Sequence, residues 1–215
     1  MRRPPTSRAT ASVAQPGGRL VERTRETMML LAAWRVWCML AIAFAICAGL
    51  FFGTGAPFSI PQVERLCGAA PLDVRFSATT SDVERFLSGC GVEGRSAYRS
   101  MLLADLIYPL VFGLFMASSL ALAFRSYAPR RPQLVAFAVV ALIGSGFDYL
   151  ENVLEWRALT AFPAQVASTR LLGIASAAKT ITFWMAGAGL IALLVAIGVR
   201  EIGARRRRRT ADMMV

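Results

Sequence analysis

Four long runs of apolar residues dominate the sequence, and polar or charged segments separate them. The runs cover about residues 33–53, 101–124, 133–155 and 171–199. A hydrocarbon core of about 30 Å needs about 20 helical residues, so each run approaches or exceeds the length that crosses a bilayer. The runs do not alternate apolar and polar residues in short segments, as the strands of a membrane barrel do. The pattern predicts an all-α, polytopic membrane protein with a four-transmembrane-helix bundle.

The segments between and around these runs divide the chain further. The leader, residues 1–27, is rich in Pro, Gly, Ser, Thr and Arg and has no apolar period, so we expect it to be disordered. Residues 28–200 then form the membrane domain, and 201–215 form a polybasic tail. A loop of about 45–50 residues, 54–100, joins the first two predicted helices. Within it, Ser81 and Glu84 have capping-box spacing and predict a short helix.

The same loop contains two of the chain's four cysteines, Cys67 and Cys90. An oxidising outer compartment favours a disulfide, and a segment too small for a core of its own would be held down by one. We therefore expect Cys67 and Cys90 to be bonded.

Composition and charge agree with a membrane setting. The chain is 56% hydrophobic with a mean hydropathy of +0.52, and its net charge is +11. The arginines gather beside the apolar runs and do not form a solvated basic domain, so we expect no nucleic-acid partner. Leader, tail and the link between the second and third helices are all arginine-rich, which predicts an inner (plasma) membrane protein with both termini cytoplasmic. The tail's arginine run predicts binding to anionic lipid headgroups through Arg205, Arg206, Arg207, Arg208 and Arg209.

The chain contains no histidine, so the commonest metal ligand and physiological proton carrier is missing. We therefore expect no cofactor and no zinc or haem site. Any acid–base chemistry would fall to carboxylates, tyrosines, cysteines or the single lysine, Lys179.

Polar residues of three predicted helices should meet at one depth. With a rise of 1.5 Å per residue, Asp148 lies about 20 Å from the inner end of the third helix, in the outer leaflet. The antiparallel second and fourth helices bring further polar groups to this depth. The predicted polar layer, the candidate ligand- or cation-binding site, comprises Asp105, Tyr108, Asp148, Glu151, Asn152 and Lys179.

Helical spacing predicts that these groups face the bundle interior. Ala141, Ser145, Asp148 and Asn152 form one stripe, and a ridge of small residues on the second helix begins at Gly113. The layer then contains more acids than its lysine can neutralise. A protonated carboxyl group, an arginine from the rim or a bound cation would remove the imbalance.

Other interpretations of the polar residues remain open at this point. The acids and amide could simply hydrogen-bond across helices and fix their packing. Ser176 and Lys179 have the S-x-x-K spacing of some serine acyl-enzymes, but the other elements of that signature are missing. We expect Glu155, one turn further out than Glu151, to lie among the headgroups and to have no role in the site.

Two motifs, ADLIYPLVFG at 104–113 and FDYLENVL at 147–154, carry a resemblance. This D-x-x-YP and D-x-x-EN pair resembles uncharacterised bacterial four-helix integral membrane proteins over about residues 98–155. The resemblance implies a four-helix fold and carries no activity.

The residues favour an outward-facing acidic pocket that binds or transports a cation or a small polar solute. The first alternative is a structural or assembly subunit in a homo- or hetero-oligomer, whose charges lock helix packing. A membrane enzyme that uses carboxylate acid–base chemistry is the third, and we expect a non-enzymatic role.

Overall fold

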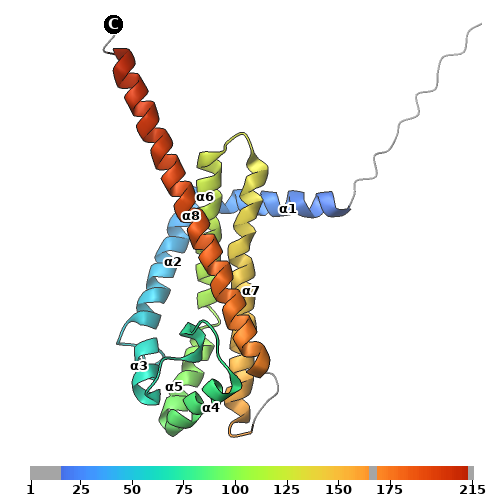
Figure 1. The fold of residues 1–215 in the computed structure, drawn as a ribbon, viewed down its shortest axis with the longest axis vertical. Coiled ribbons are helices and arrows are strands. Elements are labelled where there is room, and N and C mark those ends of the chain that lie inside the picture. Colours follow the sequence, from blue (N-terminus) through green and yellow to red (C-terminus); the bar gives the residue numbers. More distant parts are fainter. Residues whose placement is uncertain (1–15, 165–168, 213–215) are drawn as a thin grey trace, which may run out of the picture.

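In the computed structural model, which describes residues 16–164 and 169–212, every regular element is helical. Four helices are long and apolar enough to cross a membrane. They are α2 (Trp34–Phe52), α6 (Tyr108–Tyr127), α7 (Val139–Ala161), which the 3-10 helix η2 (Pro132–Ala138) precedes, and α8 (Thr169–Asp212). In Figure 1, α6 and α7 run side by side, α8 crosses them and α2 flanks α6. These contacts confirm a helical bundle of four candidate spans.

The second predicted helix, 101–124, is wrong in one respect because the chain breaks at residues 105–107. α5 (Gly91–Ala104) ends there and α6 begins at Tyr108. Pro109 lies in the first turn of α6, where its missing N–H removes no helical hydrogen bond. The break places Asp105 at the C-cap of α5, in a turn between the two helices.

Both ends of the chain are more helical than expected. α1 (Pro16–Leu31) covers part of the predicted disordered leader, and α8 continues through the arginine run. In Figure 1, α1 lies across the bundle, whereas α8 extends beyond it. α1 is held by its last turn, where Met28 is buried with Leu120 and Val135. Residues 1–15 and 213–215, also part of the leader and tail predictions, lie outside the described residues.

At the opposite end of the bundle, residues 54–104 form a helical unit that we call the cap (Figure 1). It comprises α3 (Ile60–Cys67), the 3-10 helix η1 (Leu72–Val74), α4 (Thr80–Gly89) and α5. The short helix expected near Ser81 is α4, but Thr79 and Asp82 form its capping box. Thr79 has the extended backbone of an N-cap, and both reciprocal bonds with Asp82 are present.

The cap has its own stabilising contacts. Cys67 Sγ and Cys90 Sγ lie 2.12 Å apart, forming the disulfide expected from the sequence. Gly68 ends α3 with a φ of 68°, a conformation that glycine adopts without strain. The apolar core of the cap continues onto the bundle, where Leu154 of α7 and Leu172 of α8 are buried against it. Cap and bundle therefore share one core.

The long helices also approach each other closely. A Cβ on Gly113 of α6 would lie 1.9 Å from Ser145 Oγ of α7, so any other residue there would force the Ser145 side chain to move. Ser145 Oγ donates a 2.7 Å hydrogen bond to the carbonyl of Pro109. This contact sets the distance between α6 and α7 just below the level of Asp148.

Candidate functional site

Lys179 of α8 is the centre of a buried ionic network between the bundle and the cap. The residue is 8% exposed. Lys179 Nζ lies 2.5 Å from Asp73 Oδ1 of the cap and 3.4 Å from Asp148 Oδ1 of α7, and it also pairs with Glu151. It donates a further 2.8 Å hydrogen bond to the carbonyl of Asp73. One ammonium group thus joins α7, α8 and η1.

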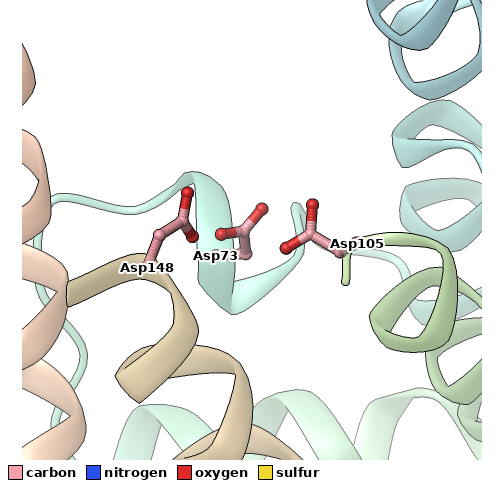
Figure 2. A group of neighbouring side chains, drawn as sticks. All are labelled: Asp73, Asp105 and Asp148. Carbon is pink, nitrogen blue, oxygen red and sulfur yellow. The ribbon is translucent and has the colours of Figure 1, made fainter. Parts of the chain in front are cut away.

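Three aspartates of this region converge from different elements. One carboxylate oxygen from each of Asp73, Asp105 and Asp148 lies within 4.8 Å of the other two. Figure 2 shows the carboxyl group of Asp73 between those of Asp148 and Asp105. Asp105 and Asp148 are 2% and 5% exposed. Three carboxylates in this arrangement repel one another unless a positive charge or protons lie among them.

Asn152 connects Asp105 to α7. Its Nδ2 donates a 2.6 Å hydrogen bond to Asp105 Oδ2 and approaches the Asp105 carbonyl at 3.4 Å. Asn152 is 4% exposed, and its Oδ1 has no hydrogen-bond partner among the described residues. A buried amide oxygen without a donor is costly, so this oxygen is a free acceptor beside the aspartates.

Glu151 and Glu155 extend the acidic groups along α7. Glu151 is fully buried and accepts a hydrogen bond from Ser176 as well as its ion pair with Lys179. Glu155 is 1% exposed and accepts a 2.5 Å hydrogen bond from Tyr98 OH of α5. The expectation that Glu155 lies among the headgroups is therefore wrong, because the cap folds over this turn of α7 and buries it.

We call the five carboxyl groups the acidic cluster: Asp73, Asp105, Asp148, Glu151 and Glu155. Lys179 is the only lysine of the sequence, and no arginine pairs with these carboxyl groups among the described residues. Two arginines near the rim, Arg99 and Arg157, do not supply the missing charge, because Arg99 lies over the Trp156 ring and Arg157 is exposed. The excess of acidic over basic groups in the site is therefore larger in the structure than the sequence predicted.

Two titratable groups outside the apolar spans respond to this environment. Burial, followed by the charges of Asp73 and Asp148, raises the pKa of Asp105 to about 9. Burial, followed by the charge of Glu155, raises the pKa of Tyr98 well above its usual value. At neutral pH Asp105 is therefore a neutral acid and Tyr98 a neutral hydrogen-bond donor.

The structure brings together five of the six residues predicted for the site. Asp105, Asp148, Glu151, Asn152 and Lys179 meet as described. Tyr108 instead packs among aromatic rings, with its ring centroid 5.2 Å from that of Phe51 and 5.9 Å from that of Phe112. The predicted polar layer was expected to line a pocket open to the outside, whereas its acids are buried beneath the cap.

Sequence reasoning missed three members of the site. Asp73 lies in the loop, 106 residues before Lys179, and no helical period relates the two. Depth along the helix alone places Glu155 among the headgroups, outside the site. The sequence pattern does not single out Tyr98. A signal was present for Asp73, because it is an acid between Pro71 and Val74 in the loop that the Cys67–Cys90 disulfide closes.

The S-x-x-K pair does not have the geometry of an activated nucleophile. Ser176 Oγ donates to Glu151 and to the carbonyl of Leu172, the latter at 2.9 Å. Lys179 is held as an ammonium among carboxylates, whereas a lysine that serves as a base must be neutral.

Comparison of this chain with protein-family models, with curated proteins and with solved structures gives no match. The geometry of the site is therefore the basis for inferring what the chain does.

Proposed function

We propose that this chain is a multi-pass membrane protein that binds a small hard cation in the acidic cluster, between the bundle and the cap. One observation carries the proposal: the acidic cluster has five carboxyl groups, four buried and one (Asp73) partly buried, whereas its single ammonium group pairs with only three of them. Ionised carboxylates in a low-dielectric setting are costly without compensating charge, and intramembrane acids usually mark ion or proton sites. A cation supplies the charge that the protein lacks.

The ligand set favours a divalent cation that prefers oxygen. Three aspartate oxygens within 4.8 Å of one another can contact one ion, because Ca²⁺–oxygen distances are about 2.3–2.6 Å. Asn152 Oδ1 offers a fourth, neutral oxygen beside Asp105. Oxygen donors suit Ca²⁺, Mg²⁺ or Mn²⁺, whereas zinc and copper prefer nitrogen or sulfur ligands.

Lys179 limits where the cation can lie. Its contact with Asp73 Oδ1 is shorter than its contact with Asp148 Oδ1, so the lysine lies towards Asp73 and Glu151. Cation binding would also displace the proton of Asp105, so affinity should increase with pH.

The orientation follows the arginine distribution. We propose that both termini face the cytoplasm of a cell with a plasma (inner) membrane and that the cap faces outward. α1 and the basic part of α8 lie towards the same end of the bundle, opposite the cap, as expected if this end is cytoplasmic (Figure 1). The disulfide in the cap also supports an outward-facing cap. Arg205, Arg206, Arg207, Arg208 and Arg209 would then follow the inner interface and attract anionic headgroups.

A structural role is the second candidate, and the bridging contacts of Lys179 favour it. An ammonium group that joins Asp73 of the cap to Asp148 and Glu151 of α7 could serve only to hold the cap in place. In that case neither cations nor small polar solutes would bind, and the remaining acids would stay protonated. The two candidates differ in their response to added cations.

Thermal unfolding of the purified protein in detergent tests the proposal. Ca²⁺, Mg²⁺ and Mn²⁺ are added separately at neutral and alkaline pH, with Na⁺ at matched ionic strength as the reference. A ligand at 100 times its Kd stabilises by about 2.7 kcal/mol, so at least one divalent ion should raise the Tm by several degrees. Asp148→Asn should remove this rise, while Asp82→Asn, the same change at the partly exposed capping residue of α4, should retain it. Equal responses of both variants would refute the proposed site.

A further inference from the structure

A groove lies where the first turns of α8 meet the chain that enters α4. Its volume is about 730 Å³. Its walls are residues 77–80 on one side and a face of α8 on the other, comprising Arg170, Gly173, Ile174, Ala177, Ala178 and Ile181. A volume of this size accommodates a ligand much larger than an ion. The groove is separate from the acidic cluster, since none of its lining residues belongs to that cluster.

Close backbone contact fixes the two walls. Ser77 Oγ donates a 3.1 Å hydrogen bond to the carbonyl of Gly173. A Cβ on Gly173 would lie 2.6 Å from the carbonyl oxygen of Ala78, so glycine is needed where the chain crosses α8. Capping of α4 by Thr79 and Asp82 holds the next residues in place. The groove is thus part of the folded structure and does not depend on a flexible side chain.

The two ends of the groove differ in chemistry. Arg170, at the start of α8, is exposed, and the Ser77 hydroxyl lies about one turn further along the helix, at the carbonyl of Gly173. Further along α8 the wall is apolar, and Ile174 and Ile181 remain 67% and 48% exposed. From Arg170 to Ile181 the helix rises about 16 Å, comparable with much of an acyl chain. Asp82, which follows the groove wall by two residues, is engaged by Thr79 and Arg85.

We propose that this groove binds a glycerophospholipid of the leaflet on the cap side. The Arg170 guanidinium group pairs with the lipid phosphate, as arginine does with phosphates in general. One acyl chain lies along Ile174, Ala178 and Ile181, where small residues leave room beside the helix. The site depends on the membrane location of α8 but not on cation binding. Its polar-to-apolar direction matches that of a lipid in the bilayer.

Native mass spectrometry of the full chain, released from detergent, tests this site. The protein is titrated with dioleoyl phosphatidylglycerol, and the dissociation constant of the first lipid adduct is measured. Arg170→Gln should weaken this adduct about tenfold, because it removes a charge-assisted contact. Ala177→Phe should weaken it similarly, because it fills the groove. Each variant is compared with a matched change outside the groove, Arg157→Gln on α7 and Ala188→Phe on the exposed side of α8.

Two further comparisons identify the source of the phosphate and separate the two proposals. Glycerol phosphate, which has the headgroup chemistry without acyl chains, should not compete with the lipid at millimolar concentration. Asp148→Asn should bind the lipid as the wild type does, even though it loses the cation response. Equal affinity of the wild type, Arg170→Gln and Ala177→Phe, or full competition by glycerol phosphate, would overturn the lipid assignment. The control variants should have wild-type affinity, and a matching loss in them would also overturn it.

Discussion

At the scale of single residues, Lys179 determines how the acidic cluster can exist in a folded protein. Its ammonium group contacts Asp73, Asp148 and Glu151, and all of these side chains are largely buried. A buried ion pair adds little compared with an apolar pair, but removing one partner leaves an uncompensated charge. Loss of Lys179 should therefore leave all three carboxyl groups without their positively charged partner.

We predict that Lys179→Met lowers the free energy of unfolding by about 3–5 kcal/mol, the usual result of breaking a buried pair. Lys179→Arg keeps the charge and should lose less. Chemical denaturation in a mild detergent, followed by tryptophan fluorescence, measures both. A Met variant as stable as the wild type would show that the cluster is neutral without its lysine.

Asp105 gives the stability a defined pH dependence. Its pKa is raised from 3.8 to about 9, so the folded protein holds a proton that the unfolded chain releases. This contribution to stability is complete below about pH 4, decreases as the pH rises and is lost above about pH 9. We predict that the Tm in the absence of divalent cations falls across this interval and that Asp105→Asn reduces the fall. An Asn variant with the wild-type pH profile would contradict the assignment.

At the scale of elements, the contact between α6 and α7 holds the two sides of the site at a fixed distance. Gly113 allows Ser145 to approach the α6 backbone, and the Ser145 hydroxyl binds the carbonyl of Pro109. Pro109 in turn begins the helix that follows Asp105. The position of Asp105 relative to Asp148 therefore depends on a contact that involves no acid.

Gly113→Ala should destabilise the protein by about 1–3 kcal/mol, the usual effect of overpacking, because its new Cβ would collide with Ser145 Oγ. Gly187→Ala in α8 is the matched control, since a Cβ there meets no atom within 4 Å. Thermal unfolding should place the control at or slightly above the wild type. Combining Gly113→Ala with Ser145→Ala should restore part of the loss, and no recovery would indicate a different cause.

The features that could be predicted from the sequence are those encoded by neighbouring residues, such as apolar run length and helical spacing. The lengths of the apolar runs gave four spans, and helical depth gave Asp105, Asp148, Glu151, Asn152 and Lys179 a common level. Asp73 could not be placed this way, because its contact with Lys179 depends on how the cap folds. Glu155 was misplaced for the same reason, since depth along α7 does not reveal that Tyr98 covers it. The helix break had a local signal in Pro109, but the apolar run 101–124 continues through that residue and predicts one uninterrupted helix.

At the scale of the whole molecule, the cap closes the end of the bundle where the acids lie. It is joined to the bundle by the ion pair of Asp73 with Lys179, by the bond from Tyr98 to Glu155 and by a shared apolar core. The disulfide lies within the cap. The cap thus excludes water from the acids and supplies Asp73 as one of the three converging aspartates.

Replacing both Cys67 and Cys90 by serine should lower stability by about 2–4 kcal/mol, since the disulfide closes a loop within the cap. We predict faster amide hydrogen exchange in α3 and α4 and little change in α6. Uniform faster exchange along the entire chain would contradict a cap that opens separately from the bundle.

Binding of a divalent cation by the acidic cluster can be measured by electron paramagnetic resonance with Mn²⁺. Free Mn²⁺ gives a strong signal that is lost on binding, so titration of the purified protein at pH 8 gives both stoichiometry and affinity. We predict one site per chain that Asp148→Asn weakens at least tenfold and Asp82→Asn leaves intact. Absence of binding to the wild type, or equal binding to the Asp148→Asn variant, would contradict it.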